Sequence, residues 1–450
     1  MRTCTTVLFA GLLVLLGDQT SAAQPLGFGS ADDPREQIPR SLFQDAWRLN
    51  LMTGPSLIAS RLRGAGAFGL DVATDRLTAR IGGTLRAFYG STYNPDLDEP
   101  YDLVRLLTFA RYQRSPRSRL YLRAGPTDRM RLGTGHVVNF FSTTASWDDR
   151  TVETEAMWRN LFLDVAAFSD NVFFDGVVGG RVALRPFASV RDQRAREIEL
   201  GFNYATDLSE AAAQPSRLEA YNVDLRFTAM NPGDFDLAPY LSYAWLPRFG
   251  RSFGAGVSLE SYNFIDIGRF RLRLGLHRNT DQFVSGYIGS FYTVNGPGAR
   301  ILDSDEFLAT SSSESFVGLP LDSIRAGTDL ITELRILFFE RFELWYFFQR
   351  HFGAQALSQY HFRLFFHATD QLLLDLSLDR GGLESFFSLF EALNDETALL
   401  FNADYHLAEP FWIFLRARYS YERIREMPDG TRRYLVQRRF EPMAGVRFSF

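Results

Sequence analysis

The chain has 450 residues, of which 46% are hydrophobic, 15% aromatic and 22% charged, with a mean hydropathy of −0.13. Its formal charge of −5 is too small to indicate a nucleic-acid partner, although all 48 basic residues are arginine. High aromatic content at a hydropathy near zero indicates that apolar and polar residues are interleaved along the chain.

The first 23 residues have the features of an export signal. Arg2 precedes a ten-residue apolar run at 7–16, which is followed by GDQTSAA. This order predicts a signal peptide over 1–23, with cleavage after Ala23, because the run is too short for a spanning helix. Cys4, the only cysteine, lies before the run, so the mature chain would offer neither disulfides nor thiolate ligands. Residues 24–64 precede the first predicted strand and are interpreted as a short periplasmic lead-in or a partial lumen filler.

From residue 65 to 450 the chain alternates apolar and polar residues with a period of two, which is the pattern of β-strands. The segment 269–277 sets Phe270 and Leu272 against Arg269 and Arg271, and 359–367 and 371–379 form a similar pair joined by ATD. Further segments lie at 66–73, 77–90, 101–113, 119–125, 131–141, 151–158, 161–168, 176–184, 196–204, 219–229, 236–246, 252–261, 282–293, 323–337, 342–350, 397–406, 411–421 and 434–450.

Two all-β folds produce such alternation. A sandwich faces its apolar side chains inward, and a transmembrane barrel faces them toward lipid. So many strands without a domain break, many of them about ten residues long, favour a single transmembrane antiparallel barrel over 65–450. The 21 candidate segments make an odd number, so at least one is wrong, and 131–141 is the least barrel-like. The expectation is 18–20 strands, within a range of 16–20.

The stretch 131–150 also contains a cluster that invites comparison with a hydrolase. His136, Asn139 and Ser142 lie close in sequence, but nucleophilic catalysis requires such groups to converge in space. The GTG at 133–135 is interpreted as a turn or bulge. The other histidines are scattered among strands, so no metal site, no cofactor and no enzymatic activity are expected.

Arginines recur on the polar faces, which in a barrel line the lumen. Candidate pore-lining residues are Arg105, Arg111, Arg269, Arg271, Arg273, Arg363, Arg416 and Arg418. Two interpretations stay open. Arginines and acids on neighbouring strands pair and fill the barrel, or the 269–273 stripe biases a pore toward anions.

The segment 294–322 contains NGPGAR and SSSES and is interpreted as a long loop. It either forms a solvated outer tip or folds inward as a constriction, as loops do in some porins.

The chain ends in EPMAGVRFSF, with Val446, Phe448 and Phe450 on one face of a strand. This ending resembles the C-terminal signal of bacterial outer-membrane β-barrel proteins, and no specific family is assigned. The resemblance implies an outer-membrane location and, as partners, outer-membrane lipid, the barrel assembly machinery and periplasmic chaperones. A homotrimer is compatible with this class.

The resemblance also places the C-terminus in the periplasm, with turns at 279–281, 338–341, 368–370 and 407–410 on that side. The long link 207–218 then falls on the periplasmic side, which does not fit.

The function expected of such a chain is a channel for small hydrophilic solutes, with a preference for anions if the arginines face an open lumen. The alternative is a closed structural or surface-assembly barrel whose outer loops bind polymer or protein. A barrel hydrolase is a more remote alternative.

Overall fold

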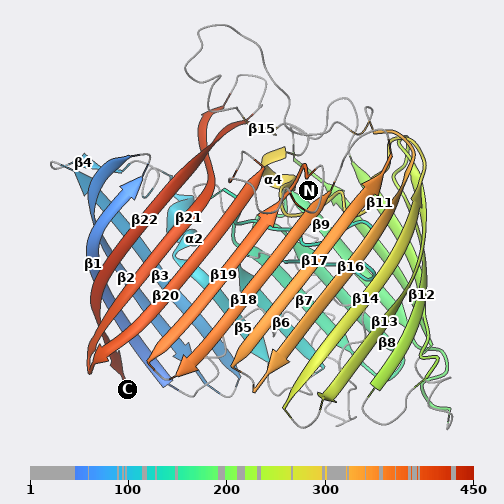
Figure 1. The fold of residues 1–450 in the computed structure, drawn as a ribbon, viewed down its shortest axis with the longest axis horizontal. Helices are drawn as coiled ribbons and strands as arrows, with labels where there is room; N and C mark the ends of the chain where they lie inside the picture. The colour runs from blue at the N-terminus through green and yellow to red at the C-terminus, as the bar shows by residue number, and fades with distance from the viewer. Residues whose placement is uncertain are drawn as a thin grey trace, which may run out of the picture.

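The computed structural model describes residues 46–450 with gaps in turns and loops, the longest of which are 191–197, 210–217 and 302–320. In the described part of the chain, twenty strands form one closed antiparallel barrel (Figure 1). Closure is made by β1 (Ala46–Ile58), which pairs with β2 (Arg61–Ala73) on one side and with the last strand, β22 (Arg432–Ser449), on the other. The predicted fold class and strand number are confirmed.

The wall strands between these follow in chain order: β3 (Leu77–Phe88), β5 (Leu107–Gln113), β6 (Leu120–Gly125), β7 (Glu153–Arg159), β8 (Leu163–Ser169), β9 (Val177–Leu184), β10 (Glu199–Asp207), β11 (Glu219–Arg226), β12 (Phe235–Trp245), β13 (Arg251–Phe264), β14 (Gly268–Asn279), β16 (Gly327–Phe338), β17 (Phe342–Phe352), β18 (Gln359–Thr369), β19 (Leu372–Arg380), β20 (Thr397–Ala408) and β21 (Phe411–Glu426). Four short elements lie outside the wall: β4 (Ser91–Thr92), α2 (Tyr101–Arg105), α4 (Tyr292–Asn295) and β15 (Ala299–Ile301). No helix in the described part of the chain is long and apolar enough to cross a membrane.

The strands form where the sequence alternates, and the alternation separates two environments. On β14, Arg273 and His277 are fully buried inside the barrel, whereas Leu274 and Leu276 expose 44% and 57% of their surface outside. A closed ring satisfies every ladder hydrogen bond internally, so the outer surface can be apolar.

The barrel starts earlier than the sequence indicated. The lead-in predicted for 24–64 is wrong from residue 46 onward, because Ala46–Ile58 is β1 and β2 begins at Arg61. Gly54 and Pro55 obscure the alternation there. They are tolerated because the β1–β22 ladder is interrupted between the pairs Thr53–Ala444 and Leu57–Phe440, opposite Pro442. The predicted signal peptide and residues 24–45 lie outside the described residues.

Three other predicted segments need correction. The segments 131–141 and 282–293 are not wall strands, because both fold into the lumen. The predicted strand 101–113 begins at Leu107, since 101–105 forms α2. Losing two segments and gaining β1 gives an even strand number, which a closed ring requires when every neighbouring pair is antiparallel.

The connections differ at the two rims of the barrel (Figure 1). The rim that holds Phe450, here called the C-terminal rim, carries short turns such as 339–341 and 409–410, with a longer link at 185–198. The opposite loop rim carries most long connections, including 280–326 and 381–396. The link 207–218 now falls on the loop rim, which removes the mismatch seen in the sequence. The turn predicted at 279–281 lies on the loop rim too, so its assignment to the C-terminal side is wrong.

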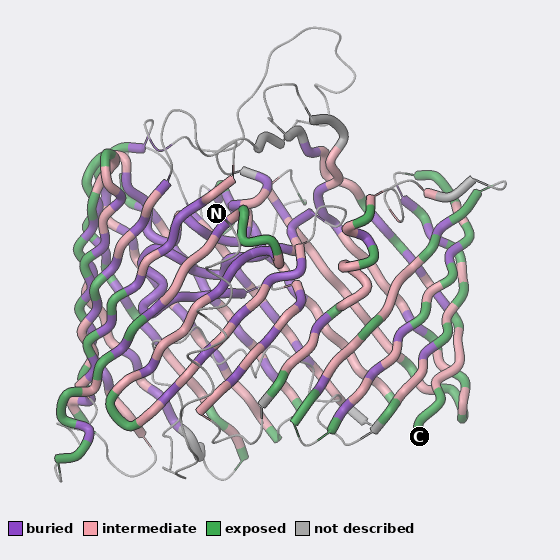
Figure 2. The backbone as a smooth tube through the Cα atoms, turned by 180° about the vertical axis from the view of Figure 1, so that it is seen from behind, coloured by how far each residue is buried: buried purple, intermediate pink, exposed green. Residues whose placement is uncertain are grey.

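Two segments from the loop rim enter the barrel and together form what we call the inner plug, residues 129–146 and 281–294. Figure 2 shows buried backbone crossing the interior. The two segments pair with each other through a parallel bridge between Val138 and Ile288. Their apolar residues, including Phe141 and Phe283, pack against small residues of the inner wall such as Ala205, Ala220 and Ala244. The inner plug therefore has an apolar core of its own inside the barrel.

Candidate functional site: an arginine-lined cavity beside the inner plug

Buried charge fixes the inner plug to the wall. Arg131 of the plug contacts Glu333 of β16 at 3.0 Å, and Glu333 also accepts a hydrogen bond from Trp345 Nε1 at 2.9 Å. Arg273 of β14 donates to the carbonyl of Thr134 and lies 3.5 Å from Glu333. Because a buried charge without a partner is costly, these contacts hold the plug in one position.

The tight turn of the plug depends on glycine. Gly133 and Gly135 have φ of +58° and +72°, which side chains other than glycine rarely adopt. A Cβ on Gly133 would meet the side chains of Arg181, Asp224 and Asn203 on the wall at 2.4–2.7 Å. The sequence interpretation of GTG as a turn is confirmed.

The three residues that suggested a hydrolase do not converge. His136 contacts the hydroxyls of Ser242 and Ser252 at 2.8 and 2.7 Å, Asn139 accepts from Arg131, and Ser142 contacts Thr144. Burial, together with the positive charge of Arg273, lowers the pKa of His136 to about 3, so its ring is neutral. Each of its nitrogens faces a serine hydroxyl of the wall, which makes His136 an anchor of the plug.

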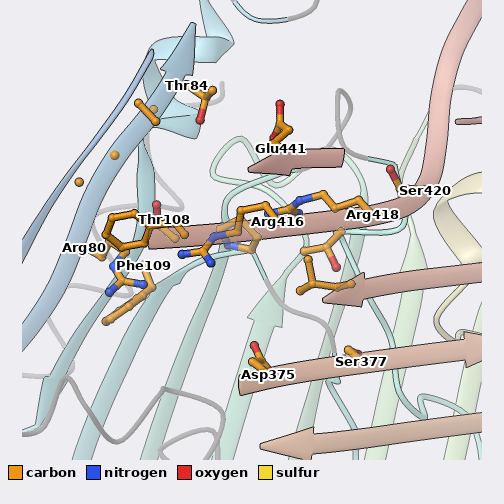
Figure 3. Close-up of a pocket in the computed structure, with 18 of the residues that line it drawn as sticks. Arg80, Thr84, Thr108, Phe109, Asp375, Ser377, Arg416, Arg418, Ser420 and Glu441 are labelled. Carbon is orange, nitrogen blue, oxygen red and sulfur yellow. The ribbon is translucent and has the colours of Figure 1, made fainter. Parts of the chain in front are cut away.

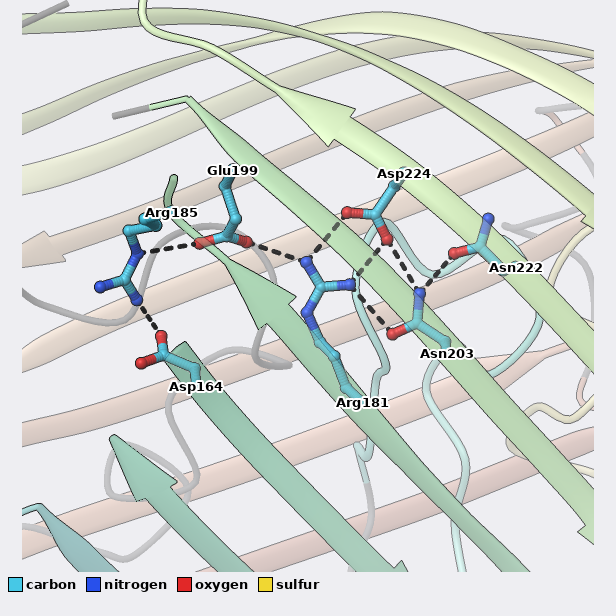
Figure 4. A network of polar contacts seen from close by, with 7 residues as sticks. All are labelled: Asp164, Arg181, Arg185, Glu199, Asn203, Asn222 and Asp224. Atoms are coloured by element: carbon cyan, nitrogen blue, oxygen red, sulfur yellow. Dashed lines mark hydrogen bonds and ion pairs between the residues drawn. The ribbon is translucent and has the colours of Figure 1, made fainter. Parts of the chain in front are cut away.

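Beside the plug, the wall of β8–β11 carries a paired network (Figure 4). Arg181 contacts Glu199 at 2.8 Å and Asp224 at 2.6 Å, and Asn203 joins Arg181 to Asn222. Arg185 bridges Glu199 and Asp164. In this network two arginines contact three carboxylates, so both arginines are paired.

The other side of the lumen contains a cavity of about 400 Å³ (Figure 3). Its lining comes from β1–β3, β5, β6 and β18–β22, and residues 142–145 of the inner plug close one flank. Seven arginines line the cavity against four carboxylates; the arginines are Arg80, Arg86, Arg123, Arg363, Arg416, Arg418 and Arg447. The carboxylates are Asp375, Asp379, Asp404 and Glu441.

Many of these charges are paired along the wall. Arg80 contacts Asp71 of β2 at 2.5 Å, and Arg86 contacts Glu441 at 2.5 Å and also Asp96. Neither Asp71 nor Asp96 lines the cavity, but both reduce the positive charge of the arginines that do.

One carboxylate serves two arginines. Asp404 contacts Arg416 at 2.6 Å and Arg447 at 3.1 Å, and Arg447 also donates to Asn50. One negative charge cannot neutralise two guanidinium groups, which are always protonated. The wall around Asp404 therefore keeps an excess of positive charge facing the cavity.

The predicted pore-lining arginines occupy three different places. Arg363, Arg416 and Arg418 line the cavity. Arg271 contacts Glu260 at 3.0 Å, Arg273 is buried under the inner plug, and Arg269 is exposed near the C-terminal rim. The structure therefore does not bring 269–273 together with the cavity.

The last two predicted arginines lie apart from these. Arg111 donates to Thr78 at 3.0 Å on the wall. The expectation that Arg105 sits on a strand is wrong, because it ends α2 and contacts Asp102.

Sequence reasoning missed the parts of the cavity that come from β1 and from the plug. Asn50 and Met52 lay in a segment interpreted as a lead-in. Ser142 was considered only as a member of a possible hydrolase cluster, and Thr144 lay between the predicted segments 131–141 and 151–158. Alternation around Asn50 was the available signal, but Gly54 and Pro55 cut it short. Among the described residues, no three histidines, cysteines or acids gather as a group able to hold a metal ion.

No protein-family model matches the sequence, and no curated protein matches it. Solved structures similar to the chain are outer-membrane β-barrels. Wzi, an outer-membrane protein involved in group 1 capsule assembly in Escherichia coli and a carbohydrate-binding β-barrel, shares 9% identity over 93% of this chain and 87% of its own, with a TM-score of 0.38. OccD3 (OpdP) of Pseudomonas aeruginosa shares 9% identity over 95% and 96%, with a TM-score of 0.31. OpdK of Pseudomonas aeruginosa, solved with vanillate, shares 10% identity over 90% and 98%, with a TM-score of 0.35.

Proposed function

We propose that this barrel lies in a bacterial outer membrane and is a channel for small hydrophilic solutes, with a preference for anions. The observation that carries the proposal is the cavity with seven arginines against four carboxylates, in which Asp404 is shared by two arginines. In this proposal solute passes beside the inner plug, on the side of the lumen where the lining arginines outnumber the lining carboxylates. Fixed positive charge in a pore favours anions over cations.

The test is conductance of the purified, folded barrel in planar bilayers under a KCl gradient. Open steps with a reversal potential of anion-selective sign are expected, and the selectivity should weaken as salt rises and screens the arginines. Arg416→Gln should reduce the selectivity. Arg251→Gln serves as the matched control, because Arg251 is exposed at the loop rim and does not line the cavity. A cation-selective potential, or no effect of Arg416→Gln, contradicts the anion preference.

A second candidate function is a closed barrel that serves surface assembly. It is favoured by the buried plug and by the fact that at least five of the seven cavity arginines contact a carboxylate. Bilayers that stay silent with protein known to be folded would favour this candidate over the channel.

A further inference from the structure

We infer that the cavity binds a polyhydroxylated organic anion, of which a sugar acid is the simplest example. The inference deepens the proposed function by naming a class of solute. Its basis is the combination, in one cavity, of guanidinium groups, carboxylates and the hydroxyls of Thr84, Thr108, Ser377 and Ser420 (Figure 3). Ser142 and Thr144 of the inner plug add two hydroxyls, and Ala145 of the same segment accepts a backbone hydrogen bond from Tyr421, the neighbour of Ser420.

Ser420 is the residue that points most directly to a ligand. Its side chain lines the cavity, the residue is 7% exposed, and its Oγ has no hydrogen-bond partner among the described residues. A buried hydroxyl without a partner costs free energy, because it has lost its hydrogen bonds to water. A ligand group that hydrogen-bonds to this Oγ removes the cost, so the position suits a bound hydroxyl or carboxylate oxygen.

Arg416 and Arg418 precede Ser420 at alternate positions of β21, on the same face of the strand (Figure 3). Residues at every second position of a strand point to one side and lie about 6.6–6.8 Å apart. Guanidinium groups bind carboxylates through paired, charge-assisted hydrogen bonds. Because Arg416 shares Asp404 with Arg447, a ligand carboxylate here adds the negative charge that this part of the wall lacks.

The carboxylates of the cavity select the rest of the ligand. Asp375 lies on β19, and Glu441 on β22 beside the arginines (Figure 3). Ionised carboxylates only accept hydrogen bonds, so they favour a ligand that carries hydroxyl donors and disfavour chloride or an aromatic acid without hydroxyls. A volume of about 400 Å³ lies within the usual range for small-molecule sites.

The experiment is calorimetric titration of the purified barrel in detergent with D-glucuronate, and with glucose, benzoate and chloride as comparison ligands. Glucuronate should bind more tightly than all three. Ser420→Ala should weaken glucuronate binding about fivefold, which corresponds to one net hydrogen bond. Ser261→Ala is the matched control, because Ser261 is also a buried serine whose Oγ lacks a partner among the described residues, but it lies outside the cavity. Arg416→Gln should weaken glucuronate binding more than glucose binding.

Binding of benzoate or chloride as tight as that of glucuronate overturns the inference, and so does equal weakening by Ser420→Ala and Ser261→Ala. If the Arg416→Gln variant does not fold, the comparison of Ser420→Ala with Ser261→Ala decides whether the cavity binds glucuronate. The result is independent of conductance, since calorimetry requires no open pore. If the barrel conducts anions but does not prefer glucuronate, the channel function stands and the proposed ligand class is rejected. If the barrel binds glucuronate but conducts no ions, the ligand class stands and the channel function is rejected.

Discussion

Glu333 connects the inner plug to the wall of the barrel. It is fully buried on β16 and contacts Arg131 of the plug, Arg273 of β14 and Trp345 of β17. Glu333 thereby connects three wall strands to the plug, which a single side chain can do only from inside the barrel. Removing its charge leaves two arginines buried beside a neutral group.

Glu333→Gln should therefore destabilise the barrel by about 3–5 kcal/mol, the usual cost of breaking a buried ion pair. The measurement is the temperature at which the folded barrel loses its faster migration on a denaturing gel. Glu409→Gln is the control, because Glu409 is exposed in the turn at the C-terminal rim. Equal unfolding temperatures in the two variants would show that Glu333 does not hold the plug.

At the scale of elements, β22 combines a role in closure with an outward apolar face. Phe448 is 40% exposed on the outside, and the backbone N–H of Phe450 donates to the carbonyl of Trp47 at 2.9 Å. The last residue of the chain thus extends the β1–β22 ladder past Ser449. This position suits a terminal strand that is recognised during assembly and then closes the barrel.

Replacing both Phe448 and Phe450 with Ser should reduce the amount of assembled barrel in cells, while the lumen stays unchanged. Assembly is measured as heat-modifiable protein in the outer-membrane fraction. The double change Phe162→Ser and Phe227→Ser is the matched control, since both residues are exposed near the same rim. If the control pair lowers assembly as much as the terminal pair, general loss of apolar surface explains the defect.

At the scale of the whole molecule, the barrel is closed by a seam between the first and last strands. Leu51 pairs with Val446 across it, and the seam is interrupted only between Thr53 and Leu57 in the described register. Directly opposed residues on antiparallel strands have Cα atoms about 4.5–5.5 Å apart, within the reach of a disulfide.

Leu51→Cys with Val446→Cys should therefore form a cross-link under mild oxidation. Cys4, the only native cysteine, is replaced by Ser in both variants so that it does not compete. The cross-link is detected as a mobility shift that a reductant reverses. Leu51→Cys with Phe440→Cys is the control, because Phe440 pairs with Leu57. Failure of the first pair to cross-link in folded protein would contradict closure through β1 and β22.

Sequence alone determined what depends on short-range periodicity. The alternation at 269–277 identified the strand, its outward leucines and its inward arginines, because adjacent side chains on a strand point to opposite faces. The same rule placed Arg363, Arg416 and Arg418 inside the barrel. The even strand number was not accessible, since Gly54 and Pro55 hid β1 and two plug segments resembled weak strands.

Only the tertiary structure decided how the lumen is divided. Arg131 meets Glu333 across 202 residues of chain, and Arg86 meets Glu441 across 355. Such pairs depend on which strands close the ring and on which loops turn inward, and no local pattern carries that information. The arginines at 269–273 illustrate the difference. Their inward face followed from alternation, but whether they face a cavity, an acid or the inner plug depended on residues far away in the chain.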